Sequence, residues 1–263
     1  MGSSRPAPLP ALWTKTSYLW TASDPALAAV NGDDLLPDLA IGRLPAASVE
    51  EAASLVRKQL DWEDSGQDLA GAAALVADNP DAGGDFEADI ADIQASFLPG
   101  RPVERILVRE DGASTRDRIR AAFDGGLSLA SYVGHGGAAV WASENVLNSW
   151  DAPSLLAQPR QPLLLTLNCL NGYFVAPSYD SLAEAFLKVD GRGVIAAIAP
   201  SGLSLEAPAH VFHRALLAEL TSGAHARLGD ALLAAQKADA ESGAMPELVS
   251  VYQLLGDPAL KLK

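Results

Sequence analysis

Residues 162–174 have the sequence Pro-Leu-Leu-Leu-Thr-Leu-Asn-Cys-Leu-Asn-Gly-Tyr-Phe, and this stretch decides the fold. Its apolar and β-branched run, 163–167, is too short for a helix and predicts a strand that is buried on both faces. Asn171-Gly172 predicts the turn that follows. Cys169 is the only cysteine of the chain and stands at the C-terminal end of this strand, where open α/β sheets place their chemistry.

A second apolar run, 127–133, leads directly into Gly134-His135-Gly136-Gly137. If both runs are parallel strands of one sheet, His135 and Cys169 emerge at the same edge. A cysteine needs a base or a positive neighbour to form the reactive thiolate near neutral pH, and His135 can be that partner. Glycines let the backbone approach a substrate, so the backbone N–H groups of Gly136 and Cys169 are the predicted oxyanion hole.

Each of these residues also has a plainer interpretation. A lone cysteine in a leucine-rich strand is more often an inert core residue, and a lone histidine beside glycines is more often a turn residue. The occurrence of both at the ends of buried strands in an α/β pattern favours a catalytic pair.

The stretches around His135 and Cys169 resemble the gingipain family of cysteine peptidases, which belongs to the caspase-like clan. Five stretches carry the resemblance in the family's order: 37–45, 121–130, 133–136 with Trp141, 168–174 and 256–260. The resemblance implies a mostly parallel central sheet flanked by helices on both faces over residues 39–263. Residues 1–38 would then be an N-terminal remnant or extension that packs on this core.

The resemblance also assigns functions to three acidic residues that follow the predicted strand 72–77. Asp78 stands where gingipains carry the acidic residue that orients the catalytic histidine, although its side chain could instead cap its own turn. Asp85 and Asp89 compete for the position of the substrate-binding acid in the S1 pocket, which pairs with a basic residue before the scissile bond (P1). Asp85 is preferred, and its alternative is an ordinary helix N-cap. One departure from Arg-cleaving members is that 201–205 lacks their tryptophan.

The rest of the chain alternates predicted strands with predicted helices, which indicates an α/β fold. Further strands are expected over 72–77, 103–108 and 193–199. Helices are expected over 48–63, 86–97, 114–123, 181–189, 206–220 and 224–241, with Ser48, Asp85, Ser114 and Ser181 as caps.

Composition limits the partners. A chain of 263 residues with 49% hydrophobic residues can bury the core of one large domain. Its net charge of −14 argues against nucleic acid and anionic membranes, and no apolar stretch is long enough to span a membrane. Protein or peptide substrates are the expected partners. The resemblance implies a secreted or cell-surface protein, but residues 1–12 show no signal peptide.

No cofactor is expected to be required. Four acids, Asp24, Asp33, Asp34 and Asp38, could gather a Ca²⁺, although their spacing matches no EF-hand loop and solvated loop acids are the alternative. His210 and His213 lie three positions apart with no third ligand in sight, so a pair of surface histidines is expected there rather than a metal site.

The sequence therefore predicts a cysteine-type endopeptidase that works through an acyl-enzyme on Cys169, with His135 as general acid and base and a basic P1 preference. One alternative is an inactive caspase-like binding module of a larger secreted or surface protein. Another is a different Cys/His enzyme, such as an amidotransferase or thioesterase. Nucleophile-elbow enzymes place the nucleophile before the histidine, whereas here the histidine comes first.

Overall fold

The structure is a computed structural model that describes residues 10–32, 34–108 and 112–262. Its centre is a six-stranded sheet in the order β11-β10-β9-β5-β3-β4. Five strands run parallel: β3 (Ala73–Ala77), β4 (Val103–Leu107), β5 (Leu129–Val133), β9 (Leu163–Leu167) and β10 (Ala196–Pro200). The sixth strand, β11 (Tyr252–Leu255), pairs antiparallel with β10 at one edge, and β4 forms the other edge.

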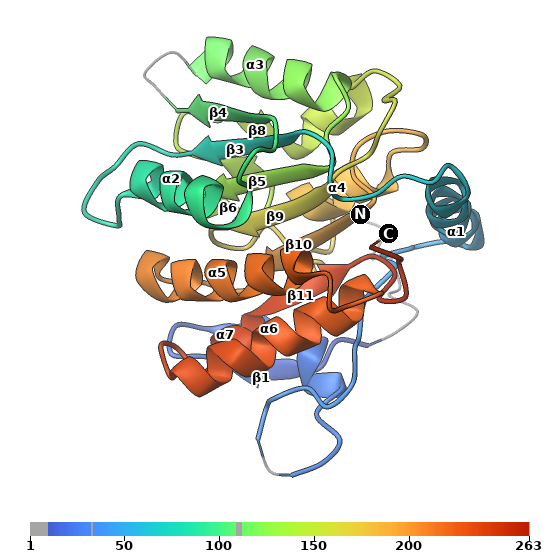
Figure 1. Ribbon diagram of the computed structural model, residues 1–263. Coiled ribbons are helices and arrows are strands. Elements are labelled where there is room, and N and C mark those ends of the chain that lie inside the picture. The colour runs from blue at the N-terminus through green and yellow to red at the C-terminus, as the bar shows by residue number, and fades with distance from the viewer. Residues whose placement is uncertain (1–9, 33, 109–111, 263) are drawn as a thin grey trace.

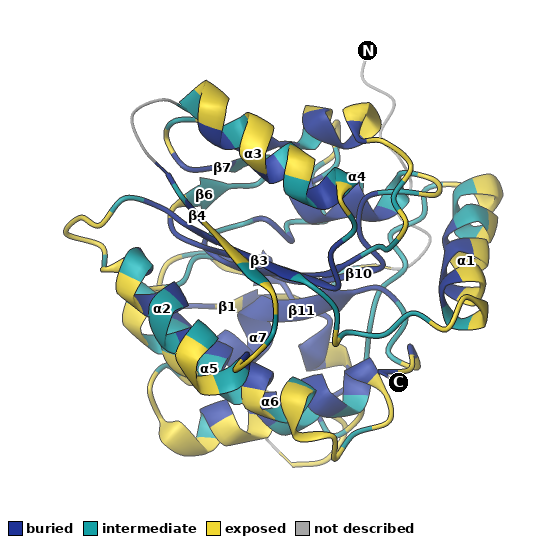
Figure 2. Ribbon diagram, turned by 45° about the horizontal axis from the view of Figure 1, so that its top comes forward, coloured by how far each residue is buried: buried dark blue, intermediate teal, exposed yellow. Residues whose placement is uncertain are grey.

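Helices cover both faces of this sheet (Figure 1). One layer contains α2 (Phe86–Phe97), α5 (Glu206–Ser222) and α6 (Leu228–Ser242), and the other contains α3 (Gly112–Asp124) and α4 (Leu182–Lys188). Alternate residues of β9 enter the two layers, since Leu163, Leu165 and Leu167 belong to one core and Leu164 to the other. Figure 2 shows buried strands between helices whose outer faces are exposed. The predicted fold class is confirmed.

Local capping explains where several helices begin. The side chains of Ser48, Asp85 and Ser181 accept hydrogen bonds from backbone N–H groups in the first turns of α1 (Val49–Asp64), α2 and α4. These predicted caps are confirmed, and α4 has the full capping box with Glu184. Ser114 is different because α3 already begins at Gly112, so Ser114 lies inside the helix and the predicted cap there is wrong.

Two elements begin later in the chain than the sequence predicted, and each difference has a physical reason. Strand β10 begins at Ala196 rather than at residue 193, because Gly193 has φ +76 and lies in a turn against α4. A Cβ on Gly193 would be 2.0 Å from the carbonyl oxygen of Phe186. Helix α6 begins at Leu228, four residues after the predicted start, once the preceding backbone has paired with the chain near its C-terminus.

Several short elements were not predicted. They are the hairpin β1 (Trp13–Lys15) and β2 (Trp20–Ala22), the small sheet of β6 (Gly136–Gly137), β7 (Val140–Trp141) and β8 (Leu147–Asn148), the short helix α7 (Leu248–Val251), and the 3₁₀ turns η1 (Pro25–Leu27) and η2 (Ser149–Ser154). Runs of two to four residues carry too little periodicity to be recognised from sequence.

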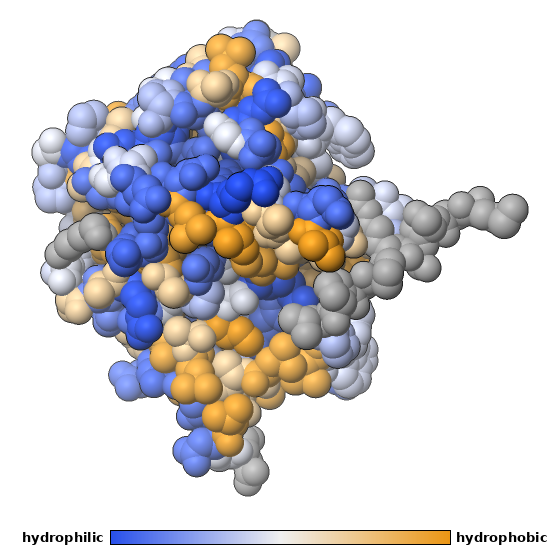
Figure 3. Space-filling model, turned by 90° about the vertical axis from the view of Figure 1, so that its right-hand side faces the viewer, coloured by the Kyte–Doolittle hydropathy of each residue, from blue (hydrophilic) through white to orange (hydrophobic). Residues whose placement is uncertain are grey.

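The N-terminal segment packs against the C-terminal half of the chain. The Thr21 hydroxyl donates to the Ser201 carbonyl at 2.7 Å, and the Arg43 guanidinium makes a bidentate pair with Asp24 at 2.6 and 2.7 Å. Figure 3 shows apolar side chains gathered at the lower end of the molecule, where the loop between β2 and α1 exposes Leu27, Val30, Leu35 and Leu39. None of the helices in the described ranges combines the length and the apolar character that crossing a membrane requires.

Candidate active site

His135 and Cys169 meet at one edge of the sheet. Strands β5 and β9 are parallel neighbours, and their register pairs Val133 with Leu167. Each of the two residues lies two positions beyond a paired residue, so both side chains emerge beside each other. They line one small cavity of about 110 Å³, whose other walls include Phe86, Asn168 and Glu206. The predicted common edge is confirmed.

The imidazole of His135 is held by an acidic residue that the sequence analysis missed. His135 Nε2 lies 3.0 Å from Asp81 Oδ2, and both side chains are about half exposed. The imidazole also makes a T-shaped contact with the Phe86 ring, with centroids 5.3 Å apart. The backbone N–H of Gly83 and the contact with His135 hold the pKa of Asp81 below its ordinary value. Asp81 stands in an Asp-Ala-Gly-Gly turn, and this was the available sequence signal.

Asp78 acts on the backbone of His135 rather than on its ring. The buried Asp78 carboxylate accepts the His135 backbone N–H at 3.0 Å and the Tyr132 hydroxyl at 3.3 Å through Oδ2. Its other oxygen accepts the N–H of Asn79 at 2.8 Å, so the turn-cap interpretation also holds. The sequence analysis expected Asp78 to hold the imidazole. The strand end aims this carboxylate at backbone N–H groups instead, and the ring contact belongs to Asp81.

Cys169 is followed by a strained residue. Leu170 has φ +66, which a branched side chain rarely adopts, and its N–H donates to the Gly202 carbonyl at 3.0 Å. The half-buried thiol lies 3.7 Å from the Ser204 carbonyl oxygen. Strain of this kind persists only where the surroundings determine it, and it fixes the direction in which the Cys169 side chain leaves the strand.

A buried amide ties the turn that follows His135 to the turn that follows Cys169. Asn171 Oδ1 accepts hydrogen bonds from Trp141 Nε1 at 2.6 Å and from Asn168 Nδ2 at 2.8 Å. Its Nδ2 donates to the Gly137 carbonyl at 2.6 Å. Trp141 in turn stacks on Tyr132, with ring centroids 4.4 Å apart. Aromatic packing was expected for Trp141, but the hydrogen bond to Asn171 was not.

Gly136 fits the predicted position of an oxyanion donor. The Ala142 N–H donates to the His135 carbonyl, so the next pair of the β6–β7 ladder, Gly136 opposite Trp141, is of the non-hydrogen-bonded type. The ladder therefore leaves the Gly136 N–H pointing away from β7. A Cβ on Gly136 would lie 2.1 Å from Asn168 Nδ2, so only glycine fits here. The oxyanion roles of Gly136 and Cys169 stay predictions.

The two predicted S1 acids lie outside this cavity. Asp85 is exposed and caps α2 by accepting the Ala88 N–H at 3.0 Å. Asp89 is buried between α2 and α5, where its Oδ1 lies 3.3 Å from His210 Nδ1. Burial and the neighbouring Glu206 carboxyl raise the pKa of Asp89 to about 7. The carboxylate that does line the cavity is Glu206.

The acids of the N-terminal segment are engaged separately. Asp24 pairs with Arg43, Asp34 accepts the Leu36 N–H, and Asp38 accepts the N–H groups of Val30 and Asn31. Asp33 lies outside the described residues. Within residues 10–32, 34–108 and 112–262, no three His, Cys, Asp or Glu side chains are grouped as metal ligands. Ca²⁺ binding stays a prediction that no contact among these residues supports.

The expected surface pair of histidines is wrong for His213, because α5 turns this side chain into the core against β5. His213 is fully buried with its Nε2 3.2 Å from the Ser131 hydroxyl, and burial lowers its pKa to about 3. His210 faces Asp89 and Asp92.

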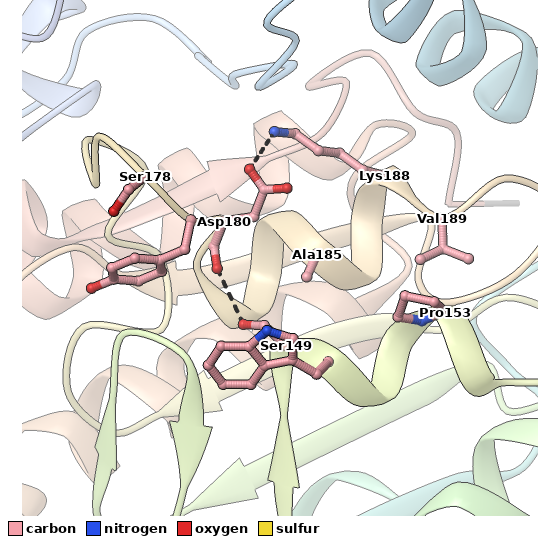
Figure 4. A pocket seen from close by; sticks show the side chains of 9 residues that line it. Ser149, Pro153, Ser178, Asp180, Ala185, Lys188 and Val189 are labelled. Carbon is pink, nitrogen blue, oxygen red and sulfur yellow. Dashed lines mark hydrogen bonds and ion pairs between the residues drawn. The ribbon is translucent and has the colours of Figure 1, made fainter. Parts of the chain in front are cut away.

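A larger cavity of about 370 Å³ lies elsewhere, between η2 and α4 (Figure 4). Its cation, Lys188, pairs with Asp180 at 2.8 Å and lies within 4 Å of Glu51 and Glu184. The Ser149 hydroxyl donates to the Asp180 carbonyl at 3.1 Å. Lys188, Asp180 and the Ser149 hydroxyl are thus already engaged with one another or with neighbouring acids, and neither His135 nor Cys169 lines this cavity.

The mostly parallel sheet, the two helical layers and a Cys/His pair at adjacent strand ends place this chain in the class of caspase-like folds. A model of peptidase family C25 matches residues 6–263, and the chain belongs to this family. The predicted gingipain resemblance is therefore confirmed.

Known relatives agree with this placement. Gingipain R2 of Porphyromonas gingivalis is 28% identical over 191 residues, which cover 67% of this chain and 25% of the relative. Gingipain R1 of the same species matches with the same identity over 67% of this chain and 19% of its own length. The chain thus spans a quarter or less of these relatives.

Solved structures show the same fold. The crystal structure of the Arg-specific cysteine proteinase gingipain R superimposes with a TM-score of 0.81 at 21% identity, covering 97% of this chain and 62% of that one. A separase–securin complex of Saccharomyces cerevisiae matches with a TM-score of 0.57 at 14% identity, covering 83% of this chain and 14% of that one.

Proposed function

We propose that this chain is an endopeptidase that hydrolyses peptide bonds through an acyl-enzyme on Cys169. The observation that carries the proposal is that His135 and Cys169, from adjacent parallel strands, line one cavity. Membership of a cysteine peptidase family supports the same reaction. The order of histidine before cysteine disfavours nucleophile-elbow enzymes.

In the proposed first half-reaction, the Cys169 thiolate attacks the scissile carbonyl carbon and a C–S bond forms. The carbonyl electrons move onto oxygen, where the N–H groups of Gly136 and Cys169 donate to the oxyanion. The intermediate collapses, the C–N bond breaks, and His135 gives its proton to the leaving amine. Nε2 faces Asp81 at 3.0 Å, so Nδ1 is the ring nitrogen left for this transfer.

In the second half-reaction, His135 takes a proton from water, and the hydroxide attacks the acyl carbon. The C–S bond then breaks, which releases the carboxylic acid product and restores the thiolate. Asp78 holds the His135 backbone and Asp81 contacts the ring during both halves. No metal or cofactor takes part in this scheme.

The finer proposal is cleavage after basic residues. The net charge of −14 favours cationic substrates, and the structurally similar gingipain R is described as Arg-specific. Secretion or surface display stays a prediction from the family resemblance. The alternative of a binding module without turnover rests on the absence of the S1 tryptophan from 201–205.

Turnover of fluorogenic peptides varied at P1 tests the reaction. Cys169→Ala and His135→Ala should each lower kcat/KM at least about 10³-fold, because nucleophile and base act as a unit. His225→Ala is the matched control, since this histidine pairs with Glu219 away from the cavity and should leave kcat/KM unchanged. Thermal unfolding establishes that each variant folds.

Alkylation provides a second measurement because Cys169 is the only thiol. Iodoacetamide should label the wild type faster than His135→Ala at neutral pH, since the imidazole promotes thiolate formation. Folded wild-type protein that cleaves no peptide and whose thiol reacts no faster than in His135→Ala would contradict the peptidase and favour the binding module.

A further inference from the structure

The carbonyl of Asn168 is held by a hydroxyl from the loop that follows the next strand, β10. The Ser204 hydroxyl donates to the Asn168 carbonyl at 2.8 Å, and the Tyr252 hydroxyl lies 3.3 Å from Ser204 Oγ. Because Ser204 gives its single proton to Asn168, the Tyr252 hydroxyl is the donor in the second bond. Burial raises the pKa of Tyr252, so its hydroxyl keeps the proton that it donates. Two hydrogen bonds in series thus connect β11 to the peptide group that precedes Cys169.

The Ser204 bond completes a row of hydrogen bonds between the turn after β9 and the chain at the end of β10. The N–H of Gly172 donates to the Pro200 carbonyl at 2.8 Å, and the N–H of Leu170 donates to the Gly202 carbonyl at 3.0 Å. At the next step, the donor is the Ser204 side chain. A serine hydroxyl therefore takes the place of a backbone donor at the end of the row nearest the cavity, which Ser204 also lines.

The bond to the Asn168 carbonyl also sets the direction of the Cys169 N–H. In a trans peptide group, the C=O and the N–H point to opposite sides of the chain. Strands β10 and β5 flank β9 on its two sides, and Ser204 follows β10 whereas Gly136 follows β5. Since the carbonyl faces its partner on the β10 side, the Cys169 N–H points to the β5 side, where Gly136 lies. In the described part of the chain, no backbone carbonyl accepts this N–H.

The same bond makes the Cys169 N–H a stronger donor. A hydrogen bond accepted by a peptide carbonyl draws electron density towards its oxygen, so the N–H of that peptide group becomes more positive, and bonds in series reinforce one another. Asn168 and Tyr252 are buried and Ser204 is half-buried, so water screens these bonds little. The series ends where the proposed reaction develops negative charge.

We infer that Ser204, supported by Tyr252, is a positioning residue that orients and polarises the Asn168–Cys169 peptide group as an oxyanion donor. The inference rests on the proposed function for its meaning in catalysis, but the state of this peptide group can be measured without turnover.

Peptide hydrolysis is the first measurement. Ser204→Ala should lower kcat about tenfold and leave KM within about twofold, because the oxyanion forms in the transition state and not in the bound substrate. Tyr252→Phe removes only the outer hydroxyl and should lower kcat about two- to threefold. Ser204→Thr keeps a hydroxyl donor and should hold kcat within about threefold of the wild type.

Ser201→Ala is the matched control. Ser201 is a buried serine of the same loop, and its hydroxyl donates to the Ala22 carbonyl at 2.6 Å, away from Cys169. This variant should unfold at lower urea concentration without a loss of kcat. An unchanged kcat in Ser204→Ala, or an equal fall in Ser201→Ala, would overturn the inference. If Ser204→Ala does not fold, an unchanged kcat in Tyr252→Phe would have the same consequence.

Alkylation separates this role from an effect on the thiol itself. Iodoacetamide reacts with Cys169 without forming an oxyanion, and Ser204→Ala keeps the backbone carbonyl that lies 3.7 Å from Cys169 Sγ. The labelling rate of Ser204→Ala should therefore match that of the wild type. A labelling rate that falls in step with kcat would show that Ser204 acts on the nucleophile, and it would overturn the inference.

Nuclear magnetic resonance observes the peptide group directly. Because Cys169 is the only cysteine, protein labelled with ¹⁵N-cysteine and with asparagine carrying ¹³C at its carbonyl gives one coupled signal, that of the Asn168–Cys169 group. Loss of the hydrogen bond in Ser204→Ala should move the carbonyl resonance to lower frequency, whereas Ser201→Ala should leave it in place. An unmoved resonance in Ser204→Ala would overturn the inference.

Failure of the inference and failure of the proposed function look different. A resonance that moves in Ser204→Ala, in a protein whose wild type cleaves no peptide, would keep the polarised peptide group and discard the peptidase. Cleavage by the wild type that is unchanged in Ser204→Ala would keep the peptidase and discard the role of Ser204.

Discussion

Buried polar groups are hydrogen-bonded more completely in one region of the molecule than in another. The first region is the pair of turns that carry His135 and Cys169, and the second is the interface between α2 and α5. In the turns, Asn171 and Trp141 complete their side-chain hydrogen bonds, and Asn168 Oδ1 is the exception. In the interface, Asp89 Oδ2 and His210 Nδ1 are buried without a hydrogen bond. A satisfied network of buried polar groups is rigid, whereas buried polar atoms that lack hydrogen bonds lower stability.

The largest expected effect is a loss of stability when the hydrogen-bond network around Asn171 is broken. Asn171→Ala removes two hydrogen-bond acceptor contacts and two donor contacts in the core, and it leaves the Gly137 carbonyl without its amide donor. Unfolding in urea should show a loss of about 3–5 kcal/mol, because each buried group left unpaired costs about 1–3 kcal/mol. Trp141→Phe keeps the stacked ring, loses only one of these bonds and should cost clearly less. Equal losses in both variants would contradict a network centred on Asn171.

The next largest effect is expected when a side chain is added at Gly136, the predicted oxyanion donor. Gly136→Ala places a methyl group 2.1 Å from Asn168 Nδ2, so either the turn or the Asn168 amide must shift. We expect kcat/KM for peptide hydrolysis to fall about 100-fold, in the range of losing one oxyanion donor, about 2.7–4 kcal/mol. Gly137→Ala is the matched control, because its Cβ would lie at an ordinary 3.5 Å from Val140. A larger loss of activity in Gly137→Ala would remove Gly136 from the mechanism.

A smaller effect, which depends on pH, is expected at the interface between α2 and α5. Burial and Glu206 raise the pKa of Asp89 to about 7, above its unfolded value of 3.8. Its contribution to stability is therefore fully present below pH 3.8 and is lost as the pH rises through about 7. Asp89→Asn has no carboxyl to ionise, so its free energy of unfolding should exceed that of the wild type by about 2 kcal/mol at pH 8. At pH 4 this difference should be absent.

Denaturant unfolding at several pH values measures this difference, with Asp85→Asn as the exposed control. A stability difference between Asp89→Asn and the wild type that does not change between pH 4 and pH 8 would show that the Asp89–Glu206 pair holds no extra proton.

The smallest effect distinguishes the two acids near His135. Asp81 and the imidazole are both about half exposed, so Asp81→Asn should lower kcat/KM only about two- to fivefold. Asp78→Asn should lower it more, because a buried carboxylate that holds the His135 N–H is replaced. Peptide hydrolysis measured across pH 5–9 compares the two. A greater loss for Asp81→Asn would make the exposed acid the main support of the histidine.

The sequence predicted the parts of this site that depend on local pattern. The apolar runs before His135 and Cys169 indicated two buried parallel strands, and side-chain caps at Ser48, Asp85 and Ser181 indicated helix starts. The partners of these residues were beyond its reach. Glu206 reaches the cavity from α5, and Asn171 contacts Trp141 across the β6–β7 turn. Such contacts depend on how layers pack, which no local periodicity records.

The pairing of Val133 with Leu167 also allows the unfolding of the central sheet to be measured at Cys169. Cys169 is the only thiol and follows the central β5–β9 pair by two residues, so opening of this pair separates the thiol from His135 and removes the faster alkylation proposed for the folded protein. Pulse labelling at increasing denaturant would therefore follow the opening of the middle of the sheet at a single natural atom, without any introduced probe.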